Sequence, residues 1–252
     1  MFAEERQKKI YEQIIKNKRA TLSELCERFG VTSATIRTDL ETLQSQGLIK
    51  RTHGGAILQS KTGYEIIPSE RLEKKDEKQR IAQLAASFIG DGDTIIIDQG
   101  TTCRELAKYL ADKRNLTVVV NDLVLALELE KQTDATVIML GGIVRKNYSS
   151  VSGSMTLDSL NGIFVDKLFL GANAVSIRSG IATPNSGTAD VKKSFIKVSS
   201  EIFVLADSSK FERTSLYRVI ECDRVNSIIT DTGLSGELLE TFTSAGINVI
   251  TA

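Results

Sequence analysis

Apolar residues near the start of the chain recur every three or four positions among charged and polar ones. This spacing predicts three amphipathic helices that bury their apolar sides against one another. The first extends from about Glu4 to Asn17. The second lies within Thr21 to Gly30, where Thr21 and Glu24 have the spacing of a capping box and the glycine ends the helix. The third extends from Ser33 to Gln46.

The second and third predicted helices are joined by a short turn that contains a glycine, which is the arrangement of a helix-turn-helix. Ile36, Leu40 and Leu43 form the buried side of the third helix. Its exposed N-terminal half carries small polar residues and an arginine, which suit close approach to a DNA groove. Residues 48–58 then predict two short strands around Gly54–Gly55, a basic wing for phosphate contact. The candidate DNA-binding residues are Ser33, Ala34, Thr35, Arg37, Thr38, Lys50, Arg51 and His53.

Each of these features has a plainer interpretation when it is taken alone. An isolated Arg37 is more often a solvated surface residue than a DNA contact. His53 fits a wing turn or a phosphate contact better than catalysis, and Cys26 fits a small core residue better than a reactive thiol. The joint order of helices and wing, rather than any one residue, favours a module that binds double-stranded DNA.

A polar, irregular stretch from Gln59 to about Lys75 follows the wing and predicts a linker. A helix is expected from about Lys78 to Ile89. Beyond it, short apolar runs alternate with helix-like segments, which predicts an α/β domain with a mainly parallel sheet. The predicted domains are 1–58 for the winged helix-turn-helix, 59–75 for the linker and 76–252 for the α/β domain. The apolar runs lie at 94–98, 116–120, 135–140, 166–171, 201–206, 226–230 and 247–251.

Polar residues follow several of these runs, and the carboxyl ends of parallel strands meet at the sheet edge where ligands bind. After Asp98 come Gly100, Thr101 and Thr102, in which glycine permits close backbone approach and two hydroxyls begin a helix. The loop 207–210 combines a carboxylate, two hydroxyls and the ammonium of Lys210. Any one such loop could simply cap a helix, but four at one edge favour an anionic, oxygen-rich ligand. The other two loops contain Asn121 and Gly141–Gly142.

The chain has 252 residues and no formal net charge, but its charges are unevenly distributed. Residues 1–61 carry 11 Lys and Arg against 7 Asp and Glu, which only weakly favours a polyanion partner. The single histidine, His53, disfavours a Ser-His-Asp triad or a histidine metal site in the α/β domain. Three separated cysteines indicate neither zinc nor disulfides, so no metal or cofactor is expected. Cys103 is expected to pack in the core and Arg104 to face solvent.

The first residues lack the apolar core of a signal peptide. The chain also has no run of about 18 apolar residues, the length of a membrane-spanning helix. We therefore expect a cytoplasmic protein that is not embedded in a membrane.

Two sets of motifs recur in the order of a known family. LSELCERFGVTSATIRTDLETLQSQGLIKRTHGGA lies within Arg6 to Ala56, and IIIDQGTT, VVVND, MLGGIVR, VDKLFLGA and LADSSKF follow along the α/β domain. The first set closely resembles the N-terminal signature of DeoR-type bacterial transcriptional regulators. The second resembles their effector domain, whose fold is similar to ribose-5-phosphate isomerase. The chain departs from the family at Thr38, where a second arginine is common, and at Thr188, where an acidic residue is more usual.

The resemblance implies a transcription factor, in the first place a repressor of a carbohydrate-utilisation operon that a phosphorylated sugar releases from operator DNA. A homodimer or homotetramer is expected, because two or more half-sites enlarge a small recognition surface. The alternatives are a sugar-phosphate isomerase with an added N-terminal module, using Asp98 or Asp207 as a base, and a protein-interaction module. In the regulator, the resemblance implies that the effector phosphate is held by Gly100, Thr101, Thr102 and Lys210, with Asp98, Asn121, Gly142 and Lys192 lining the site.

Overall fold

The computed structural model describes residues 2–17, 19–45, 48–52, 54–58 and 74–252. It divides into two compact units, Met1–Ile67 and Pro68–Ala252. Within the described ranges, no helix combines the length and the apolar character that a membrane span requires. Residues 59–73 of the predicted linker lie outside the described residues. The helix expected from Lys78 begins earlier, at Lys75.

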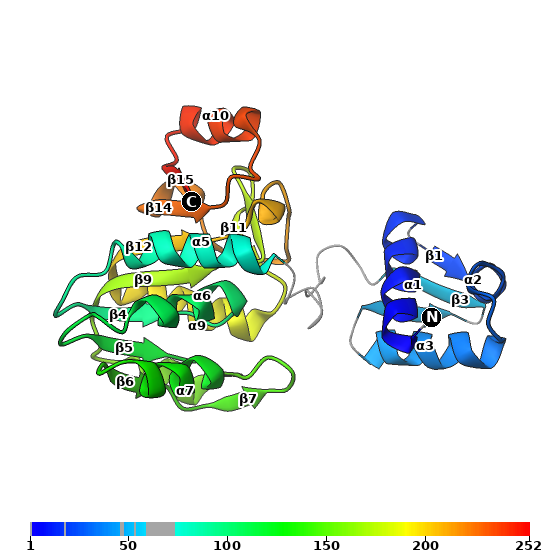
Figure 1. Cartoon of the computed structure of the whole chain (residues 1–252), viewed down its shortest axis with the longest axis horizontal. Coiled ribbons are helices and arrows are strands. Elements are labelled where there is room, and N and C mark those ends of the chain that lie inside the picture. The colour runs from blue at the N-terminus through cyan, green and yellow to red at the C-terminus, as the bar shows by residue number, and fades with distance from the viewer. Residues whose placement is uncertain (1, 18, 46–47, 53, 59–73) are drawn as a thin grey trace. The chain divides into compact units, whose positions relative to one another are not determined.

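The N-terminal unit packs helices against a small antiparallel sheet whose strand order is β1-β3-β2 (Figure 1). Ile10, Leu25, Ile36 and Leu40 are at most 1% exposed and belong to one core cluster. This core uses the apolar sides of all the helices described in the unit, as the spacing predicts. The elements are α1 (Ala3–Asn17), β1 (Arg19–Thr21), α2 (Leu22–Phe29), α3 (Ser33–Ser45), β2 (Ile49–Thr52) and β3 (Gly55–Leu58).

The limits of α2 follow from local hydrogen bonds that the sequence predicts. The Thr21 hydroxyl accepts from the Glu24 amide at 3.3 Å, and the Glu24 carboxylate accepts from the Thr21 amide at 2.7 Å. At the other end, Gly30 has φ 64° and its amide donates to the Cys26 carbonyl. The predicted capping box and glycine stop are therefore confirmed. The predicted third helix is α3, which ends at Ser45 within the described residues.

The pairing of β1 with β3 is a feature that the sequence did not predict. β1 places Ala20 opposite Ala56 and Thr21 opposite Gly55. A Cβ atom on Gly55 would lie 2.1 Å from the carbonyl oxygen of Ala20, so glycine is required by this close approach. The amide of Leu22 also donates to the Gly54 carbonyl at 2.8 Å. The wing is thereby attached to the start of the helix-turn-helix.

The C-terminal unit contains a seven-stranded sheet in which each strand pairs in parallel with its neighbours (Figure 1). Each apolar run of the sequence supplies one of these strands, so the predicted parallel sheet is confirmed. Strand β9 is the middle strand of the sheet and β4 lies beside it. Because the strands are parallel, the loops that follow them, which carry the candidate ligand-binding residues, lie at one edge of the sheet. In sheet order the strands are β15 (Val249–Thr251), β14 (Ser227–Thr230), β12 (Ser199–Leu205), β9 (Val165–Gly171), β4 (Thr94–Ile97), β5 (Thr117–Val120) and β6 (Thr136–Met139).

The sheet is covered on both faces, which explains why its strands are apolar at consecutive positions. Ile95 and Ile97 of β4 pack in one core cluster with Ile81 of α5, whereas Ile96 packs in another with Phe195 of α9. Helices α5 (Lys75–Ala86), α6 (Thr101–Glu105) and α7 (Leu123–Gln132) supply the first cluster. Helices α9 (Ser186–Lys197) and α10 (Gly236–Ser244) supply the second.

Several short elements of the C-terminal unit lie outside the predicted pattern. A two-stranded hairpin, β7 and β8, precedes the short helix α8, and a separate antiparallel sheet has the order β10-β11-β13. These strands have three or four residues each, which is too few for alternation to distinguish them from loops. Their bounds are β7 (Ile143–Arg145), β8 (Ser150–Ser152), α8 (Ser154–Asp158), β10 (Ala174–Ser176), β11 (Gly180–Thr183) and β13 (Tyr217–Ile220).

Candidate functional site

The N-terminal half of α3 presents the side chains that the sequence assigns to DNA contact. Ser33, Ala34, Arg37 and Thr38 are exposed, while Thr35 is half-buried. The predicted buried side of the helix is at most 2% exposed, so these groups project away from the core. The hydroxyl of Thr38 donates to the Ala34 carbonyl at 3.2 Å. The arginine is therefore the one charged group of this set on the exposed half of the helix.

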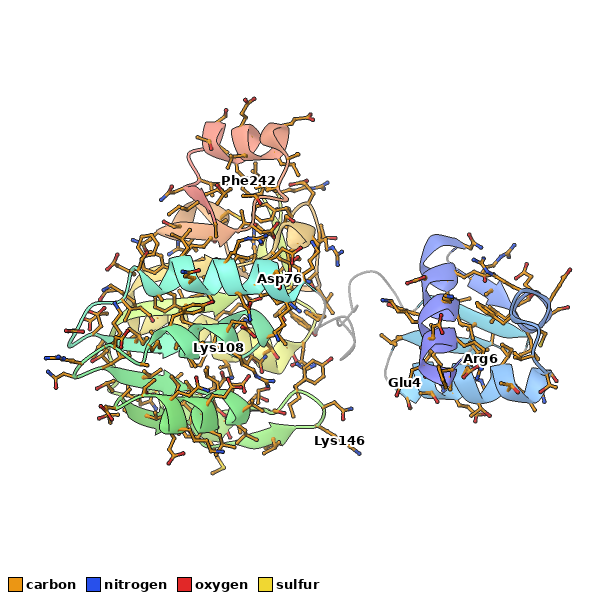
Figure 2. The ribbon with its side chains drawn as sticks, in the orientation of Figure 1. Glu4, Arg6, Asp76, Lys108, Lys146 and Phe242 are labelled. Carbon is orange, nitrogen blue, oxygen red and sulfur yellow. The ribbon has the colours of Figure 1, made fainter. Side chains whose placement is uncertain are left out.

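A buried ion pair fixes α3 against α1, and the sequence reasoning did not find it. Asp39 is 1% exposed and accepts from Arg6 Nε at 2.6 Å and from Arg6 Nη2 at 3.2 Å. The Gln7 side-chain amide donates to the same carboxylate at 2.9 Å. Arg6 projects from α1 in the N-terminal unit (Figure 2). This pair holds α3, and with it Arg37, in one orientation relative to α1.

The basic residues of the wing differ in their surroundings. Lys50 is exposed, whereas Arg51 donates from Nη1 to Glu41 of α3 at 2.6 Å. The Arg51 amide also donates to the side chain of Gln44 at 2.9 Å. Adjacent strand residues point to opposite faces, so Lys50 and Arg51 cannot serve the same face of the hairpin. His53, the third predicted wing contact, lies outside the described residues.

At the C-terminal edge of the large sheet, Asp98 and Lys192 form a buried ion pair. Their side chains are 1% and 4% exposed, and Lys192 also donates to the Gly171 carbonyl at 2.6 Å. The Gly171 amide donates to Asp98 Oδ2 at 3.0 Å. Burial raises the pKa of Asp98, although Lys192 acts in the opposite direction. Two predicted site residues, Asp98 directly after β4 and Lys192 of α9, are thus in direct contact at the end of β9.

Beside the ends of β4 and β5, two buried acceptor oxygens have no hydrogen-bond partner among the residues that the structure describes. They are Asp98 Oδ1 and Asn121 Oδ1. The other polar atom of the Asn121 side chain, Nδ2, donates to the Val151 carbonyl at 3.2 Å. Buried polar atoms are nearly always satisfied, so these two oxygens indicate a place where donors from a ligand or from water would bind.

The loop after β4 is held by a second charged pair. Gly100 has φ 125°, and its amide donates to Asp122 Oδ2 at 3.3 Å. Arg104 donates from Nε to both oxygens of Asp122, at 2.9 and 3.0 Å. The expectation that Arg104 faces solvent is therefore wrong, because the buried carboxylate of Asp122 holds it over the loop. Thr101 and Thr102 are half-buried beside this pair.

Cys103, in α6, and Gly142, after β6, are held mainly by structural contacts. Cys103 is fully buried, which confirms that it packs in the core, and burial raises the pKa of its thiol. Gly142 has φ 146°, and a Cβ atom there would lie 2.1 Å from the hydroxyl oxygen of Thr156. Glycine at this position is therefore required by packing against α8, whether or not a ligand is bound.

The loop after β12 gathers lysines around one carboxylate. Asp207 has a side chain that is 2% exposed, and Lys210 Nζ lies 3.7 Å from its Oδ2. Lys74 Nζ lies 3.6 Å from Oδ1, and the Ser209 amide donates to the same oxygen at 3.1 Å. Burial by itself would raise the pKa of Asp207, but Lys210, Ser209 and Lys74 together hold it below its ordinary value. The sequence reasoning found Lys210 and missed Lys74.

A polar cluster at the start of α9 was also missed. Thr188 is 5% exposed, and its hydroxyl oxygen accepts from Arg145 Nη1 at 3.2 Å and from Gln99 Nε2 at 3.4 Å. The Arg145 guanidinium lies 3.7 Å from the centre of the Tyr148 ring. Lys146 lies at the tip of the same hairpin (Figure 2). The only sequence signal for this cluster was the departure from the family pattern at Thr188.

Two family models together match most of the chain. The DeoR-like helix-turn-helix domain matches residues 6–62, and the DeoR C terminal sensor domain matches residues 73–232. The chain belongs to the DeoR family. We therefore call Pro68–Ala252 the sensor unit and Met1–Ile67 the DNA-binding unit. The predicted family and the predicted fold class, a winged helix-turn-helix with an α/β domain, are confirmed.

Curated relatives of the regulator are similar over nearly their whole length. A putative aga operon transcriptional repressor from Escherichia coli O157:H7 is 32% identical over 98% of this chain and 93% of its own. The transcriptional repressor AccR from Agrobacterium fabrum is 35% identical over 91% and 90%. The HTH-type transcriptional repressor GlcR from Bacillus subtilis is 34% identical over 92% and 89%. The chain is thus a DNA-binding transcriptional regulator.

Solved structures are similar at a lower level. Ribose 5-phosphate isomerase A from Methanocaldococcus jannaschii is 17% identical, with a TM-score of 0.42 over 55% of each chain. The full-length sorbitol operon regulator SorC from Klebsiella pneumoniae is 12% identical, with a TM-score of 0.39 over 81% of this chain and 88% of its own.

Proposed function

We propose that this regulator represses a carbohydrate-utilisation operon and that a phosphorylated sugar, bound at the C-terminal edge of the sensor sheet, lowers its affinity for operator DNA. The names of relatives support repression, since three of them are called repressors and one is assigned to an aga operon. The observation that carries the effector class is the combination of lysines with unsatisfied acceptor oxygens at one sheet edge.

The phosphate half of the proposed site lies between the loops after β4 and β12. Thr101, Thr102 and Lys210 supply hydroxyls and an ammonium, and Gly100 allows close approach of the backbone. These loops flank the end of β9, since β9 lies between β12 and β4 in the sheet. The negative charge of a phosphate bound there would be stabilised by the ammonium group of Lys210.

The sugar half of the proposed site uses acceptors rather than cations. Asp98 Oδ1 and Asn121 Oδ1 are buried and can each accept a hydrogen bond from a sugar hydroxyl. Lys192 holds Asp98 in place, because it binds the other carboxylate oxygen. Gly142 adjoins this side of the site. A ligand with both a phosphate and hydroxyls satisfies these groups together, whereas inorganic phosphate satisfies only one half.

In the DNA-binding half of the mechanism, α3 enters the major groove with Arg37 as the base-reading or phosphate-binding group. Lys50 of the wing adds affinity through backbone phosphates. A homodimer or homotetramer would present two or more copies of α3 to operator half-sites. Because effector and DNA are linked, the factor by which the sugar phosphate weakens operator binding equals the factor by which DNA weakens sugar-phosphate binding.

Thermal unfolding with a panel of phosphorylated pentoses and hexoses tests the effector class. A ligand that binds only the folded state at about 100 times its Kd adds about 2.7 kcal/mol of stability, so a true effector raises Tm clearly. The same sugars without phosphate should have little effect. Lys210→Met should abolish the rise, while the control Lys193→Met, at an exposed lysine, should keep it. A panel without any phosphate-dependent rise would overturn the proposal.

Arg37→Ala tests the DNA-binding half separately. Loss of one good base contact costs about 1–3 kcal/mol, so we expect operator affinity to fall by about 5- to 150-fold in a fluorescence anisotropy titration. The thermal response to sugar phosphate should be unchanged. Equal operator affinity in the variant and the parent would contradict the assignment of Arg37.

A further inference from the structure

The first turn of α5 begins with a backbone conformation that is unusual for the residue that adopts it. Lys74, the N-cap of the helix, has φ 57° and ψ 44°, in the left-handed region. N-cap residues normally have extended angles and a side chain that accepts a hydrogen bond from the helix, but Lys74 makes no such bond. In residues other than glycine, left-handed backbone is costly and persists where other contacts hold it. Some contact of Lys74 must therefore offset this local strain.

The ion pair between Lys74 and Asp207 is that contact. Asp207 is nearly inaccessible, and its two oxygens lie 3.6 Å from Lys74 Nζ and 3.7 Å from Lys210 Nζ. The Ser209 hydroxyl and amide donate to the same oxygen that faces Lys74. One buried carboxylate thus joins the start of α5 to the loop that carries Lys210, the proposed phosphate ligand.

The charges around Asp207 favour a change of partner for the two lysines when an anion binds beside them. The ammonium groups of Lys74 and Lys210 lie on the two oxygens of one carboxylate, that of Asp207. A phosphate beside Lys210 offers oxygens that compete with Asp207 for both lysines, and charge-assisted bonds to phosphate are strong. The Lys74 side chain is 37% exposed and has a flexible stem, which lets its ammonium follow the new anion.

Lys74 also lies at the point where the chain enters the described part of the sensor unit. It directly precedes α5, which packs against β12 and β14, and Asp76 marks this end of the helix (Figure 2). The Lys78 amide donates to the Lys74 carbonyl at 3.1 Å, which closes the first turn. A change at Lys74 is therefore a change in the first turn of α5, on the side of the chain that leads to the DNA-binding unit.

We infer that Lys74 is a second lysine of the anion site and the residue that transmits its occupancy: bound phosphate takes the Lys74 ammonium from Asp207 and so alters the first turn of α5. This inference rests on the proposed phosphate site. It supplies what a linked mechanism requires, a contact that differs between the empty and occupied states. It also explains why a lysine in a strained conformation stands where the two units are joined along the chain.

Hydrogen exchange of the full chain, with and without inorganic phosphate at constant ionic strength, tests the inference. The amide of Lys78 reports the bond to the Lys74 carbonyl directly. In the parent protein we expect phosphate to change its exchange rate by about threefold or more. Lys74→Gln should remove this change and weaken phosphate binding, while Lys74→Arg should restore part of both. The control Lys75→Gln removes the same charge from an exposed neighbour and should behave like the parent.

The outcomes separate this inference from the proposed function. If phosphate raises the Tm of the parent and protects residues 208–210, but the Lys78 amide responds equally in the parent and in Lys74→Gln, the phosphate site stands and transmission through Lys74 is wrong. If Lys75→Gln loses the response as fully as Lys74→Gln, the effect is one of general charge and the inference is also overturned. If inorganic phosphate neither raises Tm nor protects the 208–210 loop, the inference about Lys74 fails; if the panel of phosphorylated sugars also gives no rise in Tm, the proposed function fails with it.

Operator binding adds a readout that a purely structural role would not change. Because Lys74→Gln lacks the ion pair with Asp207 that phosphate would break, it should bind operator DNA more weakly than the parent already in the absence of ligand. At saturating concentrations of a sugar phosphate from the thermal panel, its operator affinity should fall about tenfold less than that of the parent, since coupling factors are typically 5- to 150-fold. A variant with full release at saturation would show that Lys74 binds phosphate without transmitting its presence, which contradicts the inference.

Discussion

Each unit of the regulator buries a carboxylate on the inner side of its functional surface, but the two carboxylates differ in how fully they are bonded. Asp39 of the DNA-binding unit accepts three hydrogen bonds from α1, distributed over both oxygens. Asp98 of the sensor unit is bonded on Oδ2 by Lys192 and Gly171, while Oδ1 has no partner among the described residues.

This difference separates a structural charge from one available to a ligand. A buried carboxylate whose two oxygens both accept hydrogen bonds within the protein is not available to a ligand. Its role is to orient the elements that it joins. A buried carboxylate with one unsatisfied oxygen carries a desolvation cost that a donor from a ligand would remove. Asp39 therefore belongs to the rigid support of α3, whereas Asp98 belongs to the proposed effector site.

Replacing Lys192 should give the largest effect, because it leaves Asp98 buried without a counter-ion. Breaking a buried ion pair in this way costs about 3–5 kcal/mol. We expect Lys192→Met to lower the stability of the sensor unit by this amount at neutral pH, measured by hydrogen exchange of β4 and β9. Effector binding should be lost as well.

The stability that Lys192→Met loses should depend on pH, because Asp98 remains buried in the variant. Burial raises the pKa of Asp98 in the folded state above its unfolded value, so protons favour the folded form. The contribution to stability is full below the unfolded pKa of about 3.9 and is lost as pH rises through the folded-state pKa. The variant should therefore recover part of its stability relative to the parent in mild acid. Equal deficits at acid and neutral pH would show that the loss comes from packing.

Removing Asp39 should have a smaller effect, confined to the other unit. Hydrogen bonds to a charged group contribute about 1.5–3 kcal/mol, and Arg6, with 11% of its side chain exposed, retains some contact with water. Asp39→Ala should thus destabilise α1 and α3 by about 2–3 kcal/mol in hydrogen exchange, and operator binding should weaken with it. The thermal response to sugar phosphate should be unaffected; a matching loss in the sensor unit would remove the distinction drawn between the two carboxylates.

The smallest effect is expected at Glu41, the exposed carboxylate that binds Arg51. Its side chain is 60% exposed, and surface pairs of this kind contribute about 0–1 kcal/mol. Glu41→Gln should leave the stability of α3 nearly unchanged. It also releases Arg51 from an acidic partner, so operator affinity should rise slightly in a low-salt anisotropy titration. A stability loss as large as that of Asp39→Ala would show that burial is not what distinguishes these pairs.

Local patterns in the sequence predicted most of the fold. Thr21 and Glu24 locate the start of α2 because a capping box is a relation between residues three apart. The sheet strands were recognisable because a strand covered on both faces is apolar at consecutive positions, as Ile95 to Ile97 are. By contrast, β1 has only three residues and depends on β3 for its pairing. A strand that short carries no periodicity of its own.

The candidate site was predictable only in part, and for a related reason. Residues such as Thr101 and Lys210 follow apolar runs directly, so their place at the sheet edge could be inferred from topology. The contacts of Arg104 and Lys74 could not be found in this way. The partner of Arg104, Asp122, lies 18 residues further along the chain, and the partner of Lys74, Asp207, lies in the loop after β12. Long-range charge pairs depend on the finished fold, and a single sequence does not contain a local signal for them.

The close approach of Gly55 to Ala20 affects the spacing between the wing and the helices of the DNA-binding unit. The wing contacts and the contacts of α3 are separated by a distance that the β1–β3 pairing sets, and this pairing has no room for even one methyl group. If α3 reads bases and the hairpin binds phosphates as proposed, this tight connection makes both contact the duplex at one fixed spacing. Gly55, a residue without a side chain, would thus fix the spacing between the two proposed contact surfaces.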